Sequence, residues 1–332
     1  MAFANVWNKG NKMPSFDVSS VGFAVLDVLG YPVSRIPEGG RADFIEQIRM
    51  TVAGTAAATA VDCAILGLNT RMVSTVGTDE MGDFLVNKMN AFGLDTTLVR
   101  RDGSVQTSAT ILPVRPNGER PALHVPGTAA TFDVADEDMD AALDARIIHI
   151  GGTGLLRTFD GAKTLRFIQK AKELGRITTF DLIQATPETT ELVLPLLPYI
   201  DYFIPSIEEA SAMAGLESPV EVAYWFKEKG VKNVILTMGG DGVYVDPEQG
   251  QPFSLAAHDI DVVDTTGCGD SFSAGVIVGL VKGWTLQESA RFAGAVAAKV
   301  AMGLGSDGTL TSFDDTWAAM NDWPLKAMSA TS

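Results

Sequence analysis

The sequence predicts an α/β protein in which a mostly parallel β-sheet is covered by helices on both faces. Short runs rich in Ile and Val alternate with helix-length segments through most of the 332 residues, which is the pattern of repeated strand–helix–strand units. The short runs are bounded by Gly, Pro or Asp, as is typical of buried parallel strands. We find neither an internal repeat nor a low-complexity linker, so we expect a single domain.

The predicted elements follow one another in a regular order. The strands are Val18–Leu26, Met72–Val76, Ile147–Ile150, Ile177–Phe180, Tyr202–Ile204 and Val234–Thr237. The helices are Gly54–Leu66, Met81–Ala91, Ala162–Leu174, Pro219–Lys229, Phe272–Val281 and Leu286–Met302.

Two stretches depart from this order. Tyr31–Gln47 contains two prolines and a Gly-Gly pair. Farther on, Thr107–Val114 and Pro121–Val125 have the composition of strands, and the sequence Pro-Asn-Gly-Glu at 116–119 between them is typical of a hairpin turn. Such a hairpin forms either a flap over a site or a surface feature with no role, and the pattern favours neither.

Composition and charge narrow the classes of partner. The net charge of −16 would repel nucleic acid and anionic membranes, so neither is expected as the main partner. Two cysteines, Cys63 and Cys268, imply no disulfide framework. No apolar run approaches the roughly 18–20 residues of a transmembrane helix, and the first ten residues lack the apolar core of a signal peptide. We therefore expect a cytoplasmic protein.

A glycine-rich turn joins a strand-like run to a predicted helix at 264–270, with the sequence Asp-Thr-Thr-Gly-Cys-Gly-Asp. Free backbone N–H groups and the helix dipole make such a junction a natural anion site, and Gly267 and Gly269 let the backbone approach an anion closely. The carboxylate of Asp270 would repel that anion, so its presence needs a reason. A role as general base supplies one, because the carboxylate could take a proton from an acceptor hydroxyl while the amides hold a phosphoryl group. A simple helix cap remains the alternative.

Cys268 has two interpretations as well. A helix N-terminus lowers a thiol pKa, which would favour a reactive cysteine. None of the three histidines, at 124, 149 and 258, lies near it in sequence. We therefore interpret Cys268 as a source of a backbone N–H group and a small side chain.

In these residues the chain resembles the ribokinase family of carbohydrate and nucleoside kinases (the PfkB type). The family's motif Asp-Thr-x-Gly-Ala-Gly-Asp is similar to 264–270, with Cys268 in place of the alanine. The resemblance runs from about Val18 to Phe313. Its other motifs, in the family's order, are Val21-Gly22 with Asp27, the glycine and helix of 54–67, the turn 77–82, and Thr237–Gly242.

The resemblance implies a ribokinase-like three-layer sandwich. The domain would span 16–320, with a small β-sheet lid from about 31–49 and 104–127. Residues 1–15 and 322–332 would be flexible tails. It also implies a sugar-like small-molecule substrate, ATP and Mg²⁺ as cofactors, K⁺ as a further candidate, and a homodimer formed through the lids.

The resemblance also implies roles for individual residues at the positions that match the family's motifs. The resemblance implies that Asp270 is the base and that the amides of 267–269 form the anion hole. The residues that would contact the sugar are Asp27 and Gly54. Those along the nucleotide would be Thr237, Gly239, Gly240 and Gly242. Glu209 would hold Mg²⁺ through water, while Asp264 and Thr266 would hold a monovalent cation.

The expected reaction is transfer of the γ-phosphoryl group of ATP to a hydroxymethyl group of a sugar or sugar derivative. A nucleoside kinase and a catalytically silent sugar or nucleotide sensor remain alternatives. The chain departs from the family at Ala53 and Ala58, where a glycine and a sugar-reading asparagine are usual, and at Ser206, where the family has asparagine. A P-loop kinase is excluded, because no Gly-Lys-Ser/Thr occurs. A dehydrogenase is disfavoured, because the Gly-x-Gly at 152–154 lacks its third glycine.

Overall fold

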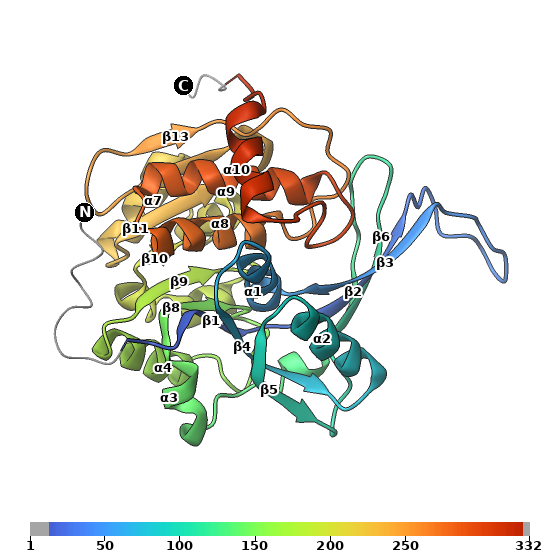
Figure 1. Ribbon diagram of the computed structural model, residues 1–332, viewed down its shortest axis with the longest axis horizontal. Coiled ribbons are helices and arrows are strands. Elements are labelled where there is room, and N and C mark those ends of the chain that lie inside the picture. The colour runs from blue at the N-terminus through green and yellow to red at the C-terminus, as the bar shows by residue number, and fades with distance from the viewer. Residues whose placement is uncertain (1–12, 328–332) are drawn as a thin grey trace.

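A large, mostly parallel sheet forms the centre of the molecule (Figure 1). The computed structural model describes residues 13–327, and within them nine strands make this sheet in the order β13-β12-β11-β10-β9-β8-β1-β4-β5. All neighbours from β11 to β5 are parallel, and β12 and β13 pair antiparallel at one edge. The strands are β1 (Phe16–Gly22), β4 (Thr70–Gly77), β5 (Asp95–Asp102), β8 (Ala145–Gly151), β9 (Ile177–Asp181), β10 (Tyr202–Phe203), β11 (Asn233–Thr237), β12 (Val243–Asp246) and β13 (Phe253–Leu255).

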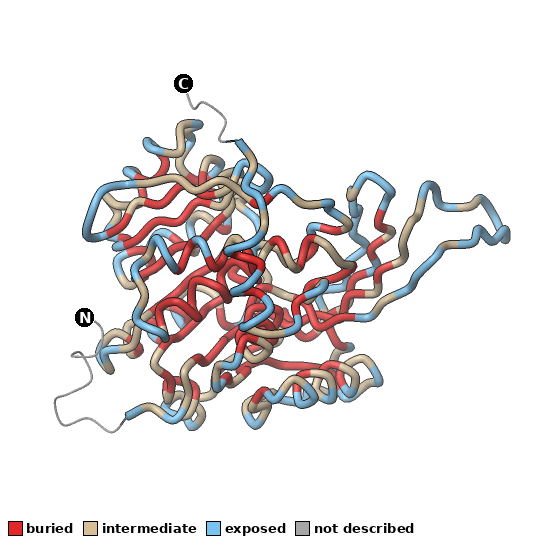
Figure 2. The backbone as a smooth tube through the Cα atoms, turned by 45° about the horizontal axis from the view of Figure 1, so that its top comes forward, coloured by how far each residue is buried: buried red, intermediate tan, exposed pale blue. Residues whose placement is uncertain are grey.

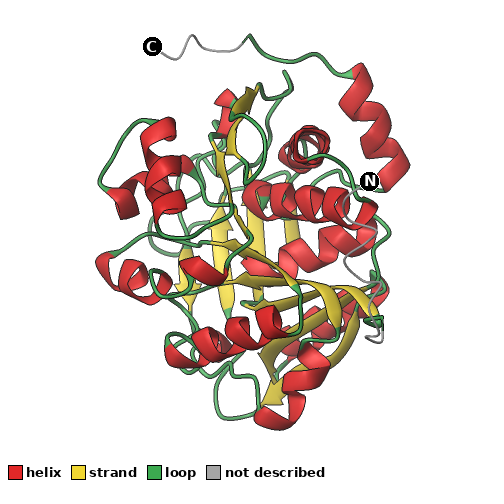
Figure 3. Ribbon diagram, turned by 90° about the vertical axis from the view of Figure 1, so that its left-hand side faces the viewer, coloured by secondary structure: helices red, strands yellow, loops and turns green. Residues whose placement is uncertain are grey.

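Helices cover both faces of this sheet, as the sequence predicts (Figure 3). On one face pack α1 (Thr55–Ile65), α2 (Glu80–Ala91), α8 (Cys268–Lys282) and α9 (Leu286–Ala301), with α10 (Phe313–Asp322) outside α9. On the other face pack α3 (Met139–Ala142), α4 (Ala162–Glu173), α5 (Pro187–Val193), α6 (Ile207–Ala214) and α7 (Pro219–Glu228). The six predicted helices are all confirmed, although α8 begins four residues earlier than predicted.

The first predicted strand is wrong as a single element. Instead of one strand over Val18–Leu26, β1 ends at Gly22 and β2 (Val25–Tyr31) begins in a different sheet. Gly22 has φ of +132°, and a Cβ there would lie 2.1 Å from the carbonyl oxygen of Gly151. The close approach of β8 therefore requires a glycine, and the chain leaves the large sheet at this position.

The second sheet has four strands within the described residues, in the order β3-β2-β6-β7. Its members besides β2 are β3 (Gln47–Ala53), β6 (Ala109–Pro113) and β7 (Leu123–Val125). The predicted hairpin is confirmed, since β6 and β7 pair antiparallel. The long β2–β3 loop, whose two sides lie within the predicted segment 31–49, extends away from the body and is largely exposed (Figures 1 and 2).

The predicted tails fall partly outside the described residues, which exclude 1–12 and 328–332. The described part of the second tail packs on the domain. The Lys326 amide donates to the Ala257 carbonyl over 2.9 Å, and Leu325 forms an antiparallel bridge with His258.

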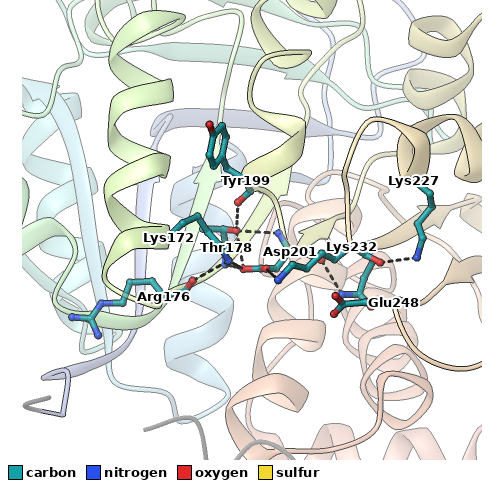
Figure 4. A network of polar contacts seen from close by, with 9 residues as sticks. Lys172, Arg176, Thr178, Tyr199, Asp201, Lys227, Lys232 and Glu248 are labelled. Atoms are coloured by element: carbon teal, nitrogen blue, oxygen red, sulfur yellow. Dashed lines mark hydrogen bonds and ion pairs between the residues drawn. The ribbon is translucent and has the colours of Figure 1, made fainter. Parts of the chain in front are cut away.

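A buried carboxylate holds the amino ends of three neighbouring strands together (Figure 4). Asp201, just before β10, accepts a hydrogen bond from the Thr178 amide at the start of β9 over 2.9 Å. Its other oxygen pairs with the Lys232 ammonium, just before β11, over 3.0 Å. Lys172 of α4 completes the cluster. The polar groups of this cluster thus pair with one another, and ligands of open α/β sheets usually bind at the opposite, carboxyl ends of the strands.

Candidate active site

The glycine-rich turn opens α8 directly. Gly267 is the N-cap residue with φ of +78°, and a Cβ there would lie 2.7 Å from the Cα of Ser306, so only glycine fits. The Cys268 amide donates to the Thr265 carbonyl over 3.3 Å. Within residues 13–327 the amides of Gly267 and Gly269 have no hydrogen-bond partner. Of the three amides predicted as an anion hole, these two are therefore the ones left unpaired.

Asp270 does not cap the helix. The N-cap position belongs to Gly267, and no side chain caps α8. Burial raises the pKa of Asp270 to about 7, a shift that Arg120 opposes and that the negative charges of Asp27 and Glu209 increase. A carboxylate with a pKa near neutral pH is suited to accept and release a proton. The geometry thus removes the helix-cap alternative.

Asp264 stabilises the glycine-rich turn through hydrogen bonds. Its Oδ1 accepts hydrogen bonds from the Thr266 amide (2.9 Å) and hydroxyl (2.7 Å), and its Oδ2 accepts one from the Gly305 amide (2.8 Å). Asp264 is completely buried. The residue predicted to hold a monovalent cation therefore also fixes the turn and the neighbouring loop.

That loop, 303–308, is tied to the small sheet by Arg49 of β3. The Arg49 guanidinium donates to the carbonyls of Leu304 and Gly308 and pairs with Asp307 over 2.8 Å. This links β3 to the loop that lies against Gly267, so the small sheet is attached next to the glycine turn.

Arg120 is a site residue to which the sequence assigned no role. It lies between the hairpin strands β6 and β7, and its Nε is 3.4 Å from the Thr265 hydroxyl and 3.9 Å from Asp264 Oδ1. Its charge lowers the pKa of both Asp27 and Asp270. The hairpin therefore reaches the glycine-rich turn at 264–270. The signal in the sequence that could have identified Arg120 was a cationic residue directly after the hairpin turn at 116–119.

Asp181 is a second residue missed by the sequence analysis. It ends β9, its Oδ2 accepts a 3.3 Å hydrogen bond from Ser273 of α8, and its pKa lies well above the usual range because of burial and the charges of Asp270 and Glu209. A polar residue at the carboxyl end of a buried strand was the available signal.

Glu209 stands in the first turn of α6 as part of a capping box. Its Oε2 accepts from the Ser206 amide (3.0 Å) and hydroxyl (2.9 Å), whereas Oε1 accepts no hydrogen bond within the described residues. Burial raises the pKa of Glu209. Among residues 13–327 no three His, Cys, Asp or Glu side chains are arranged to hold a metal ion directly. A cation reached through water, near Asp181, Glu209 and Asp270, would fit these carboxylates, since Mg²⁺ usually keeps several waters.

A pocket of about 660 Å³ adjoins the turn. It brings together the four residues predicted to lie along a nucleotide and the first residues of α8. They are Thr237, Gly239, Gly240 and Gly242, with Cys268 and Gly269. Apolar side chains of β12, β13 and α9 form much of its remaining wall. The volume and the mixed lining suit a small organic ligand with an anionic group.

The two predicted sugar contacts lie on the side of the small sheet. Asp27 of β2 is buried, and burial raises its pKa to about 6, against a hydrogen bond from Thr110 and the charge of Arg120. Gly54 precedes α1 with φ of +97°, and a Cβ there would lie 2.6 Å from the Phe23 carbonyl oxygen. Asp27 thus shares its electrostatic environment with Asp270, while the backbone alone accounts for the glycine at 54.

Comparison with known proteins agrees with this geometry. Residues 15–311 match the model of the pfkB family of carbohydrate kinases. The chain therefore belongs to this family, whose members are phosphotransferases with an alcohol group as acceptor. No helix within residues 13–327 combines the length and apolar character that crossing a membrane requires.

Individual relatives differ in the acceptors that their names give. The chain is 26% identical over 291 residues to the ATP-dependent 6-phosphofructokinase of Thermoanaerobacterium thermosaccharolyticum, covering 85% of this chain and 87% of that protein. The fold is similar to Arabidopsis thaliana ribokinase complexed with ribose and ATP (TM-score 0.78, 21% identity, 93% and 99% of the chains). It is also similar to a putative ribokinase II of E. coli in complex with ATP and Mg²⁺ (TM-score 0.79, 18% identity, 92% and 98%).

Proposed function

We propose that this protein transfers the γ-phosphoryl group of ATP to a hydroxymethyl group of a sugar or sugar derivative. One observation carries the proposal. A carboxylate whose pKa is raised to about 7 stands three residues after the N-cap of α8, beside unpaired amides and a nucleotide-sized pocket. A protein that only bound a phosphate compound would gain nothing from that carboxylate.

In the proposed mechanism Asp270 takes the proton of the acceptor hydroxyl. The amides of Gly267 and Gly269 stabilise the charge on the transferred phosphoryl group, and each such donor contributes on the order of 3 kcal/mol in comparable sites. Arg120 keeps part of the Asp270 population ionised near neutral pH by opposing the effect of burial. Positioning and electrostatics supply most of the rate in phosphoryl transfer.

Glu209, with Asp181 and Asp270 nearby, is proposed to hold Mg²⁺ through waters. When bound, the ion neutralises charge on the β- and γ-phosphates. A monovalent cation such as K⁺ at Asp264 and the Thr266 carbonyl remains a prediction, as does a cytoplasmic location.

The acceptor is proposed to lie between Asp27, Gly54 and the lid. An unphosphorylated sugar, a sugar phosphate and a nucleoside all fit the chemistry of the turn, since that turn handles only the transferred group. The nucleoside kinase therefore stays as the second candidate.

The outer face of the small sheet supports the proposed homodimer. Met50, Val28, Ile111 and Leu123 pair in register across its four strands, and three of these are exposed. Two copies of a chain with net charge −16 could meet through this uncharged row without opposing like charges. Ile111→Glu should convert a dimer to a monomer in size-exclusion chromatography with light scattering, and a native monomer would contradict the proposal.

The function is tested by measuring ADP release over a panel of sugars, sugar phosphates and nucleosides. Asp270→Asn should lower kcat by about 10² or more and leave ATP binding nearly intact. Asp314→Asn, an exposed carboxylate of α10, is the matched control. ATP and ligand binding without any phosphoryl transfer by the native protein would favour the sensor.

A further inference from the structure

The C-terminal segment 323–326 lies along the rim of the predicted nucleotide pocket. The Asp259 amide donates to the Pro324 carbonyl over 2.9 Å, and the Lys326 amide donates to the Ala257 carbonyl over 2.9 Å. Because Ala257 and His258 line the pocket themselves, this antiparallel pairing brings Leu325 and Lys326 to its wall.

Trp323 holds the segment in place independently of Lys326. Its ring meets the His258 ring edge-on with centroids 6.0 Å apart, and the Lys299 ammonium lies 4.9 Å from its centroid. Its amide continues α10 by donating to Ala319. The position of the segment therefore does not depend on the lysine side chain.

The Lys326 side chain points to the glycine turn of the pocket. Its Nζ lies 3.1 Å from where a Cβ on Gly240 would stand. No carboxylate of residues 13–327 lies within 4 Å of this ammonium. An unpaired lysine normally extends into solvent, whereas this one is half-buried over the turn that carries Gly239 and Gly240.

The positive charge of Lys326 in this pocket matters for binding a nucleotide. A chain with net charge −16 repels a nucleotide at long range, so each cation inside the pocket matters for holding the phosphates. The ammonium is a compact charge with three donors, which suits a phosphate oxygen.

We propose that Lys326 binds a phosphate oxygen of the nucleotide at the Gly239–Gly240 turn, which makes the C-terminal segment part of the nucleotide site. The inference rests on the proposed function, because it needs a nucleotide in this pocket. It adds a contact from a segment that lies within the predicted tail 322–332.

The test is isothermal titration of ADP and of adenosine into the full-length protein. Lys326→Met should weaken ADP binding about tenfold, as expected for one charge-assisted hydrogen bond, and change adenosine binding by less than about twofold. Lys326→Arg should retain most of the ADP affinity. Lys170→Met removes the same charge elsewhere, since the Lys170 side chain of α4 is 43% exposed, and this variant should bind ADP like the native protein.

The other possible results of the titration would each contradict the proposed contact between Lys326 and a nucleotide phosphate. Equal weakening of ADP and adenosine would mean that the segment only shapes the pocket, and native ADP affinity in Lys326→Met would exclude the contact. The same loss in Lys170→Met would reduce the effect to net charge. If the native protein binds neither ADP nor adenosine, the proposed function fails together with the inference. Lys326→Gln repeats the titration if Lys326→Met does not fold.

Discussion

Replacing Arg120 by Met should move the pH dependence of the reaction. Burial raises the pKa of Asp270 to about 7, and Arg120 is the largest influence that lowers it. An opposite charge close to an Asp lowers its pKa by about 1–3 units. Because the Arg120 side chain is 40% exposed, solvent screening places its effect at the low end, about one unit.

The higher pKa of Asp270 in this variant should lower the rate at neutral pH. A shift in the pKa of the base from about 7 to about 8 reduces its ionised fraction at pH 7 from about one half to about one tenth. The Arg120→Met variant should therefore lose about fivefold in kcat/KM at pH 7 by this effect, and recover most of that loss near pH 9, where the base is ionised in both proteins.

The assay is kcat/KM for MgATP between pH 6.5 and 9.5, with the acceptor that the substrate panel identifies. Arg115→Met is the matched control, since Arg115 lies on the same hairpin, is 49% exposed and pairs with Glu119 over 3.6 Å. The acidic limb of the pH profile of Arg115→Met should coincide with that of the native protein. An acidic limb at the native pH in Arg120→Met would refute the electrostatic role of Arg120.

Three further predictions concern neighbouring features. Cys268→Ala should keep most of the activity, because burial raises the pKa of the thiol to about 12 and leaves it protonated; a thousandfold loss in a standard rate assay would restore the reactive-cysteine interpretation. Deleting Asn117 and Gly118 shortens the turn of the β6–β7 hairpin but spares Arg120. If the hairpin is a lid over the acceptor, the deletion should raise KM for the acceptor more than KM for ATP, and equal changes in the two KM values would count against a lid. At fixed ionic strength the rate should be severalfold higher in KCl than in tetramethylammonium chloride, and equal rates would speak against a cation at Asp264.

Six of the nine strands of the large sheet were predictable, because the cause of a strand is local, whereas β5, β12 and β13 were not predicted. Runs such as Ile177–Phe180 and Val234–Thr237 are apolar and bounded by chain-turning residues, so they form strands wherever a core is available. The turn at 267–269 was predictable for a similar reason: a tight turn into a helix often needs a residue with positive φ, and Gly267 has φ of +78°.

The break after Gly22 was not predictable in the same way. Val18–Leu26 has one continuous apolar pattern, and only the approach of Gly151 from β8 shows where it divides between two sheets. Contacts between distant parts of a chain leave no periodic trace in either part.

By itself, the sequence determined the class of fold and the chemical character of the 264–270 turn, because strand burial, helix periodicity and glycine geometry are properties of short segments. Only the tertiary structure decided the surroundings of that turn. It showed that Asp270 is not a cap and brought Arg120, Asp181 and Lys326 to the same region from three distant segments. The pKa of Asp270 depends on burial and on charges far away in the chain, and these exist only once the chain has folded.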